Sequence, residues 1–383
     1  MQDAKSNIYC PAIHQGIYIE RVNQDSSKVA PCCAAKPQLF SNQEVEFSTN
    51  PFLLKLRQEN LQSIASVECN ECWNKESAGA SSLRQSLLEY YNQPRLQTTG
   101  LASIDYNVEP ICNATCIICS RYHSSAWLAE DQKFDAVATI ERTAASSRNN
   151  RIIEQLDFSQ LKKIYVNGGE PSLSKDLELI LEKLYRENRL HEVDVGFNMN
   201  GSVMPSNRVI ELLHHAHSVS VYFSIDGVGD QFEYTRYPLK WATLLETVAK
   251  VAEFPFLTNM AMNVSIGVHN IQFAQEIQDW WYSYTKPWRD RVRILHAFQP
   301  VVGPLSLSTV DKKLADYLSM YIETQHCEES WAYFGKQILA TANGQNQWMP
   351  WLEKLDARRN LNWQQTLPAL YDACRYTGIK FAS

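Results

Sequence analysis

From about residue 100 onward, short runs rich in Val, Ile, Phe and Tyr alternate with longer stretches whose apolar residues recur at helical spacing. The short runs predict strands over Ser103–Val108, Lys163–Asn167, Val193–Asn198, Ser218–Ser224, Asn263–Val268 and Val292–Ala297. The longer stretches predict helices over Leu173–Glu187, Asn207–His215, Trp241–Glu253 and Ile271–Ser283. Strands that alternate with helices indicate βαβ units and a parallel sheet. We therefore expect an α/β fold, a partial (β/α)6 barrel whose chemistry lies at the carboxyl ends of its strands.

The two ends of the chain differ from this central part. Residues 1–95 show little periodicity apart from a predicted helix over Ser81–Tyr91, which Pro94 ends. Residues 305–383 predict a helical segment rich in tryptophan. Four tryptophans there are expected to pack a core rather than bind a cofactor: Trp331, Trp348, Trp351 and Trp363. The expected domains are residues 1–95, 96–304 and 305–383.

The composition is that of a globular protein, with 45% apolar and 20% charged residues. A net charge of -6 and the lack of a long basic run weigh against a general nucleic-acid binder. The first residues lack the features of a signal peptide, and no stretch approaches the roughly 18 apolar residues of a membrane helix. We expect a soluble, cytoplasmic protein. In that reducing compartment, ten cysteines point to metal ligation rather than to disulfides.

One group of cysteines follows the first predicted barrel strand. Cys112, Cys116 and Cys119 form a C-x3-C-x2-C sequence in the loop after it. Three thiolates this close in sequence can bind three irons of a [4Fe–4S] cluster and leave the fourth iron open to a ligand. A structural zinc site would need a fourth protein ligand, for which His123 is the nearby candidate. Chance spacing among ten cysteines is the remaining interpretation.

This loop resembles that of the radical S-adenosylmethionine (SAM) superfamily, whose hallmark is C-x3-C-x2-C after the first barrel strand. The residue before the third cysteine, aromatic in many members, is Ile118 here. Three further resemblances end the next three strands: Gly168-Gly169-Glu170-Pro171 is similar to the GGEP motif, Asn198-Met199-Asn200-Gly201 to the T-N-G turn, and Ser224-Ile225-Asp226-Gly227 follows. The resemblance implies that the GGEP motif meets the amino group of SAM's methionine part.

The same resemblance suggests roles for single residues near the strand ends. It assigns Ser224 and Asp226 to the ribose hydroxyls, and Arg236 to the methionine carboxylate. It places Gly267 and His296 beside the adenine. Plainer interpretations stay open: the GGEP motif is also an ordinary strand-to-helix turn, Ser224 and Asp226 suit a turn, and Arg236 suits the surface.

A second group of cysteines, Cys10, Cys32, Cys33, Cys69 and Cys72, lies in the first 72 residues. Cys69 and Cys72 form a C-x2-C pair, and Cys32 and Cys33 are adjacent. Adjacent cysteines rarely serve one metal equally. Cys10, one of Cys32 or Cys33, Cys69 and Cys72 would therefore complete a set of four thiolates. Zinc and an iron–sulfur cluster both fit such a set, and the spacing does not decide between them.

This segment is similar to that of the twitch-domain radical proteins, bacterial and phage relatives that place an auxiliary-cluster domain before the barrel. The shared features are C-P near the start, P-C-C, and C-x2-C followed by E-x-x-G-x-S-x-x-R, here Glu76, Gly79, Ser81 and Arg84. The similarity continues through the barrel into Trp351–Pro368. It implies an auxiliary [4Fe–4S] cluster of the twitch or SPASM type. Zinc and reduced buried thiols are the alternatives.

The resemblance implies an enzyme that reductively cleaves SAM to a 5′-deoxyadenosyl radical, which takes a hydrogen atom from a substrate. Relatives with auxiliary clusters often modify peptides, so we expect a peptide substrate and a one-electron reductant such as flavodoxin or ferredoxin. The alternatives are a radical dehydrogenase or epimerase of a small molecule such as a sugar, and a non-catalytic iron–sulfur or zinc protein. Cys327 and Cys374, outside both groups, are either a hydrogen donor to a substrate radical or simply buried thiols.

Overall fold

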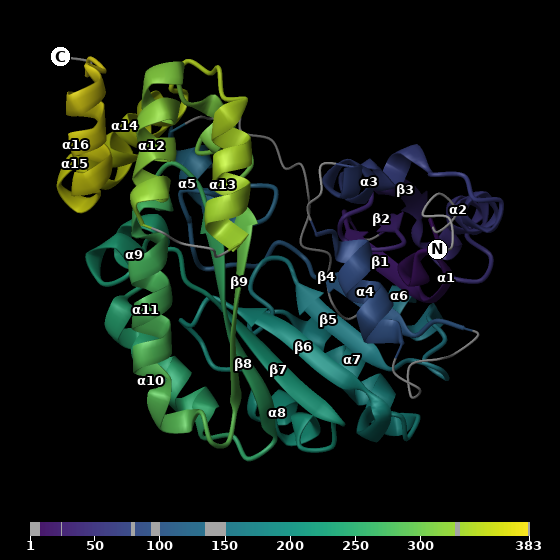
Figure 1. The fold of residues 1–383 in the computed structure, drawn as a ribbon. Coiled ribbons are helices and arrows are strands. Elements are labelled where there is room, and N and C mark those ends of the chain that lie inside the picture. The colour runs from purple at the N-terminus through teal and green to yellow at the C-terminus, as the bar shows by residue number, and fades with distance from the viewer. Residues whose placement is uncertain are drawn as a thin grey trace.

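One sheet runs through the molecule. The structure is a computed structural model, and it describes residues 8–23, 25–77, 81–92, 100–134, 151–325 and 330–381. Among these residues the sheet has nine strands, in the order β3-β2-β1-β4-β5-β6-β7-β8-β9 (Figure 1). In this order, every neighbouring pair from β1–β4 through to β8–β9 is parallel. At the opposite edge the pairs β1–β2 and β2–β3 are antiparallel. The expected α/β fold with a parallel barrel-type sheet is therefore confirmed.

The six expected barrel strands all form. They are β4 (Ser103–Asn107), β5 (Lys163–Asn167), β6 (Asp194–Met199), β7 (Ser218–Ser224), β8 (Leu257–Ile266) and β9 (Arg293–Pro300). The helices among them are α5 (Ser125–Phe134), α6 (Arg151–Gln155), α7 (Lys175–Arg186), α8 (Asn207–Leu213), α9 (Asp230–Thr235), α10 (Trp241–Ala252) and α11 (Ala274–Tyr284). Strand β8 begins six residues earlier than expected, because Leu257–Met262 pairs with β7 and β9.

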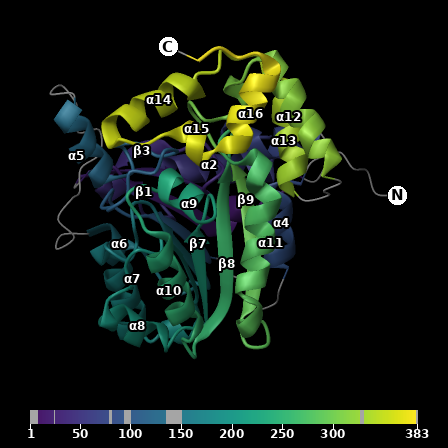
Figure 2. The same cartoon turned by 90° about the vertical axis from the view of Figure 1, so that its left-hand side faces the viewer.

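The barrel strands differ from a fully buried parallel sheet in having one polar face. In β5 and β7 buried apolar residues alternate with half-exposed ones, such as Tyr165 and Tyr222. Strands covered on both faces would instead be apolar throughout. Helices α7, α8 and α10 lie together on one side of the strands (Figure 2), and α7 buries Leu177, Leu181 and Leu184. The opposite face is therefore left for polar contacts.

The described part of the first 92 residues is more regular than the sequence suggests. They form α1 (Pro11–Gln15), β1 (Gly16–Arg21), β2 (Ser26–Ala30), β3 (Gln38–Ser41), α2 (Pro51–Leu61), α3 (Asn70–Ser77) and α4 (Leu83–Tyr91). The expectation of an irregular segment was wrong, because these elements are too short for their periodicity to stand out. The expected helix over Ser81–Tyr91 is confirmed as α4, which Ser82 caps. The expected boundary at residue 95 lies outside the described residues.

The C-terminal part is helical, as expected, with α12 (Lys312–Thr324), α13 (Ser330–Ala340), α14 (Trp348–Arg359), α15 (Trp363–Thr366) and α16 (Pro368–Thr377). These helices lie together at one end of the strands (Figure 2). Trp331, Trp348 and Trp363 are buried in the common core, and Trp351 is half-buried against it. No helix in the described ranges is long and apolar enough to cross a membrane.

A buried group of charges joins the first strand to the barrel. Arg21, at the end of β1, contacts the carboxylates of Glu109 at 3.1 Å and Asp176 at 2.6 Å. All three side chains are at most 4% exposed. Burial and the neighbouring Asp176 raise the pKa of Glu109 to about 8. The arginine thus offsets the repulsion between two carboxylates that water does not screen.

Arg21→Leu should lower the free energy of unfolding by about 3–5 kcal/mol, because it leaves two buried carboxylates without a cation. The loss should be larger at pH 9 than at pH 7. Arg21 lowers the pKa of Glu109, which is about 8 in the parent protein, so above pH 8 the folded variant still holds a proton that the folded parent and the unfolded chain both release. Urea denaturation at the two pH values measures this. Arg208→Leu, which removes an exposed arginine paired with Glu182 and Glu211, should leave stability unchanged. Equal effects of both substitutions would contradict the prediction.

Candidate functional site

The loop after β4 carries Cys112, Cys116 and Cys119, and other parts of the chain hold its backbone. The Thr115 and Ile117 amides donate to the carbonyls of Tyr237 at 2.7 Å and Thr235 at 2.9 Å. Two indoles donate to the loop's carbonyls at 2.9 Å: Trp127 of α5 to Cys116, and Trp351 of α14 to Ile117. These contacts come from α5, α14 and the end of α9. The loop is therefore positioned by the whole barrel end rather than by its own sequence.

The three cysteines open into one cavity of about 250 Å³. The other walls come from the carboxyl ends of β5 to β9, where a parallel barrel places its chemistry. The cavity is lined by Cys112, Ala114, Cys116, Ile118, Cys119, His123, Gly168, Gly169, Glu170, Asn198, Met199, Asn200, Ser224, Arg236, Asn263, Ser265 and Gln299. The expected motifs of the first four barrel strands thus reach a single space.

The two glycines of the GGEP motif allow the β5 turn to approach the cysteine loop. Gly168 has a φ of +124°, and an added Cβ would lie 2.5 Å from the Asn107 side-chain oxygen. A Cβ at Gly169 would lie 2.4 Å from the carbonyl oxygen of Ile111, next to Cys112. Any side chain at either position would push the cysteine loop away from the turn.

Glu170 ties the β5 turn to the end of β6. Its buried carboxylate accepts hydrogen bonds from the backbone amides of Asn200 at 2.7 Å and Ser172 at 3.0 Å. The Asn200 side chain then donates to Asn113 in the cysteine loop at 2.9 Å. Burial raises the pKa of Glu170 to about 7, although the two amides lower it. Glu170 therefore both lines the cavity and fixes two of its walls.

Arg236 brings a positive charge to the cysteines. Its Nη1 lies 3.9 Å from the Cys116 sulfur, and its Nη2 lies 2.7 Å from an oxygen of Asp226. Asp226 is fully buried and also accepts from the Ser265 amide at 2.8 Å. His269 is buried close by, with no hydrogen bond to its ring within the described structure. Burial and Arg236 lower the pKa of His269 to about 3, so this ring is neutral.

Several expected residues stand apart from the cavity lining. Asp226 lies behind Arg236, as its ion partner, whereas Ser224 lines the cavity. Pro171, Gly267 and His296 do not line it, and the His296 ring is paired with the Tyr282 hydroxyl at 2.7 Å. Sequence reasoning missed three polar residues that do line it: Asn263, Ser265 and Gln299. The sequence did contain a signal for them. Asn263 and Ser265 are two residues apart in β8 and so face the same side of the sheet, and Gln299 lies opposite Ser265 in β9.

The second cysteine group also converges on one cavity. Cys10, Cys32, Cys69 and Cys72 line a small space with Ile13, Pro31, Ala34, Ala35, Trp73, Arg84 and Leu87. Cys33, an exposed residue, does not line it and lies beside Asp105 of β4 instead. Among the described residues, no three Cys, His, Asp or Glu side chains are grouped closely enough to hold one metal ion.

The thiol environments in both cavities suit a cluster, in which each sulfur binds its own iron, rather than a single metal ion. Burial raises the pKa of Cys69, Cys112 and Cys119 to about 12. A thiolate in such a place needs a nearby cation, and a metal ion that binds the sulfur supplies one. The three-cysteine cavity, with its glycine turn and open polar walls, fits a [4Fe–4S] cluster together with SAM. The four-cysteine cavity fits a group held by four thiolates.

The remaining cysteines lie elsewhere. Cys374, in α16, is fully buried with Leu370 and Ala373 in the core, and burial raises the pKa of its thiol to about 12. This setting is that of a space-filling thiol. Cys327 lies outside the described residues.

Comparisons with known proteins give a family for the central part of the chain. Residues 106–273 match the model of the Radical SAM superfamily, and a search of curated proteins finds no match. The solved structure "Native anSMEcpe with bound AdoMet" is 15% identical over 58% of this chain, with a TM-score of 0.38. The Streptococcus suis protein SuiB, solved bound to precursor peptide SuiA, is 12% identical over 81% of this chain and 69% of its own, also with a TM-score of 0.38.

The chain spans 59% of the length of anSMEcpe. The residues matched by the family model begin in β4 and end just before α11, and they include the three-cysteine loop, the GGEP turn and Arg236. These are the elements that line most of the 250 Å³ cavity. The part of the chain that matches the Radical SAM superfamily model is therefore residues 106–273, which we call the radical SAM domain.

Proposed function

We propose that this protein is a radical SAM enzyme whose cluster is held by Cys112, Cys116 and Cys119. The observation that carries the proposal is that these three cysteines share one cavity with Gly168–Glu170 and Arg236 inside the radical SAM domain. When bound there, the reduced cluster would supply one electron that cleaves SAM and gives a 5′-deoxyadenosyl radical. A non-catalytic protein would not require this combination of residues in one cavity.

The chain's own residues would bind the cluster and SAM and would orient SAM. The three thiolates hold three irons and leave one iron open. The backbone of the glycine turn and the Glu170 carboxylate present hydrogen-bonding groups to an amino group, and Arg236 presents a cation to a carboxylate. Ser224 offers a hydroxyl at the end of β7, as proposed for the ribose. Asp226 fits a supporting role, because its carboxylate holds the guanidinium of Arg236 in place.

We propose a second [4Fe–4S] cluster on Cys10, Cys32, Cys69 and Cys72. The shared cavity supports this set, and the contact of Cys33 with Asp105 supports Cys32 rather than Cys33 as the ligand. The division into residues 1–95, 96–304 and 305–383 is kept as part of the proposal, with the first range as a twitch-like domain. This first range is not a separate unit of structure, because its strand β1 pairs directly with β4 of the barrel.

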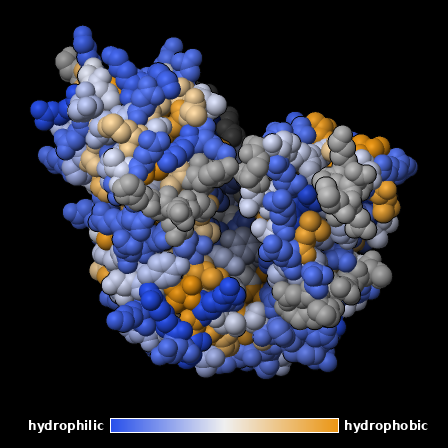
Figure 3. Space-filling model, in the orientation of Figure 1, coloured by the Kyte–Doolittle hydropathy of each residue, from blue (hydrophilic) through white to orange (hydrophobic). Residues whose placement is uncertain are grey.

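The proposed substrate is a peptide, modified in a cytoplasmic reaction that a flavodoxin or ferredoxin supplies with electrons. The support is the resemblance to peptide-modifying relatives, together with the shape of the surface. The surface is hollowed between the N-terminal elements and the C-terminal helices (Figure 3). An extended peptide can lie in such an open hollow, whereas it could not enter a closed pocket. The small-molecule alternative, a dehydrogenase or epimerase of a sugar, is tested together with the peptide.

Changing Cys112, Cys116 and Cys119 together to alanine should abolish formation of 5′-deoxyadenosine from SAM, because no thiolate remains to hold the cluster. The measurement is chromatography of anaerobic reactions with dithionite. Cys374→Ala, in the buried helical core, is the control and should retain at least half of the activity. Unchanged 5′-deoxyadenosine formation in the triple variant would refute the proposal, and its absence from the unsubstituted protein would favour the non-catalytic alternative.

Anaerobically reconstituted protein should contain about eight irons per chain if both cavities hold [4Fe–4S] clusters. Cys32→Ala should reduce this to about four, whereas the neighbouring Cys33→Ala should leave it near eight, since only Cys32 lines the cavity. Iron and zinc are measured by elemental analysis. An N-terminal site that retains zinc and no iron would reject the second cluster, and loss of iron in Cys33→Ala alone would reverse the choice of ligand.

The substrate class is tested by mass spectrometry after anaerobic incubation with SAM and dithionite. Candidate precursor peptides from neighbouring genes and a panel of sugars are compared in parallel. We expect a mass change or a deuterium exchange in a peptide that depends on SAM and disappears in the triple cysteine variant. Modification of a sugar with all peptides unchanged would replace the peptide proposal by its alternative.

A further inference from the structure

Arg84 of α4 is the one charged residue among those lining the four-cysteine cavity in the described structure. Its side chain is 9% exposed. Burying a guanidinium costs free energy unless it is paired and hydrogen-bonded. A protein that keeps a cation beside four thiols therefore gains something from its charge or from its contacts.

The contacts fix the guanidinium to α3, the helix that carries Cys72. Arg84 Nε donates to one oxygen of Glu76 at 2.9 Å, and Nη2 donates to the other oxygen. Ser82 also donates to Glu76, and the guanidinium lies 5.1 Å from the centre of the Trp73 ring. A two-point contact with a carboxylate leaves an arginine little freedom to rotate. The orientation of Arg84 is thus set by residues directly after Cys72.

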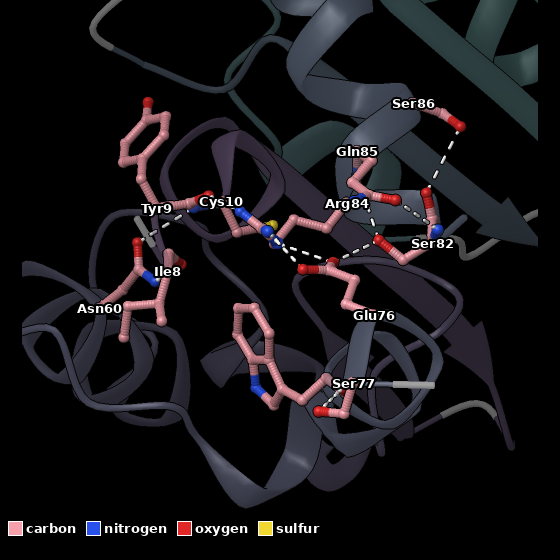
Figure 4. A network of polar contacts seen from close by, with 11 residues as sticks. Ile8, Tyr9, Cys10, Asn60, Glu76, Ser77, Ser82, Arg84, Gln85 and Ser86 are labelled. Atoms are coloured by element: carbon pink, nitrogen blue, oxygen red, sulfur yellow. Dashed lines mark hydrogen bonds and ion pairs between the residues drawn. The ribbon is translucent and has the colours of Figure 1, made fainter. Parts of the chain in front are cut away.

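Another nitrogen of the guanidinium reaches the segment that carries Cys10 (Figure 4). Arg84 Nη1 donates to the carbonyl of Tyr9 at 2.8 Å. Asn60 of α2 holds the same segment, accepting from the Cys10 amide at 3.3 Å and donating to the Ile8 carbonyl at 2.7 Å. Arg84 and Asn60 therefore both clamp the Cys10 backbone, but only Arg84 adds a charge.

That charge lies where an iron–sulfur group would be negative. A [4Fe–4S] cluster with four thiolates is an anion, and reduction adds one more negative charge. A nearby cation stabilises the reduced form more than the oxidised form. Glu76 opposes this effect, but its side chain is 17% exposed against 9% for Arg84, so solvent screens the carboxylate more. Arg84 also lines the cavity, whereas Glu76 does not, so the cation is the nearer of the two charges.

We propose that Arg84 is a positioning residue for the N-terminal cluster: it clamps the Cys10 segment to the Cys72 helix and raises the cluster's reduction potential. The inference rests on the second cluster proposed above and deepens it. It also gives a physical reason for the spacing between Glu76 and Arg84, since the two side chains meet and Arg84 lines the cysteine cavity. The serine of this network is Ser82, the helix cap, rather than Ser81.

The test uses the full chain with Cys112, Cys116 and Cys119 changed to alanine, so that only the N-terminal cluster contributes a signal. Arg84→Gln, Arg84→Lys, Asn60→Ala and the exposed control Arg208→Gln are made in this background. Iron content and an anaerobic redox titration followed by electron paramagnetic resonance are the readouts. Circular dichroism checks that each variant is folded.

Arg84→Gln should shift the ratio of reduced to oxidised cluster about tenfold toward the oxidised form at a fixed potential, which is about 59 mV for one electron. Arg84→Lys keeps the charge and should shift the ratio less than threefold. Asn60→Ala loosens the same segment without removing a charge, and should lower iron content without changing the ratio. Arg208→Gln should change neither.

Two results overturn the inference in distinguishable ways. If the unsubstituted N-terminal site takes up no iron, the proposed cluster fails and the role of Arg84 fails with it. If iron is bound but Arg84→Gln leaves both the ratio and the iron content unchanged, or shifts the ratio no more than Asn60→Ala does, the role of Arg84 alone is refuted. Should Arg84→Gln bind no iron, the ratio in Arg84→Lys decides: a value within threefold of the unsubstituted one supports the role, and a larger shift refutes it.

Discussion

The parallel pairing of β1 with β4 is the contact on which the arrangement of both cysteine sites depends. It joins Gly16 to Ser103 and continues to Glu20 and Asn107. Cys10 lies just before α1, which leads into β1, and Cys32 lies just after β2, while the three-cysteine loop follows β4. Gly16 lies in a crowded position between the neighbouring strands, since a Cβ there would lie 2.8 Å from the Pro31 carbonyl oxygen, just after β2, and 3.2 Å from the Ser103 hydroxyl oxygen of β4. One set of backbone hydrogen bonds thus fixes both groups of cysteines to the same sheet. A side-chain contact strengthens this link: Tyr122, three residues after Cys119, hydrogen-bonds Glu20 of β1 and Lys28 of β2.

Buried arginines held by carboxylates recur at each important junction. Arg236 is held by Asp226 beside Cys116, and Arg84 is held by Glu76 beside Cys10. A third, Arg21, joins β1 to the barrel. In each case the carboxylate offsets the cost of burying the cation and fixes its direction. A fixed cation is what a site with several thiolates needs, because the sulfurs repel one another until a positive charge is close.

Much of the barrel could be predicted because its signals are local. The runs over 163–167 and 218–224 are strands at the predicted residues, and the glycine turn follows β5 directly. The N-terminal strands were missed because elements of four to six residues show too little periodicity, and because the pairing of β1 with β4 joins segments far apart in sequence, which no local pattern reveals. The choice between Cys32 and Cys33 has the same origin: the neighbour that distinguishes them, Asp105, lies more than 70 residues away. Asp226 shows the converse limit, since its motif was recognised but its ion pair with Arg236 was not.

The C-terminal helices complete the site that the radical SAM domain begins. Trp351 of α14 stacks on Trp127 with ring centres 5.7 Å apart, and both indoles donate to carbonyls of the cysteine loop. Arg359, at the end of α14, lies over the rings of Trp127 and Tyr237 and pairs with Glu130 of α5. The matched domain ends at residue 273, so these supports lie outside it. Because a cluster needs its thiolates held in fixed positions, the motif alone is an incomplete description of the proposed site. The loop is held from β1 on one side and from α14 on the other, and both ends of the chain therefore belong to the proposed catalytic unit.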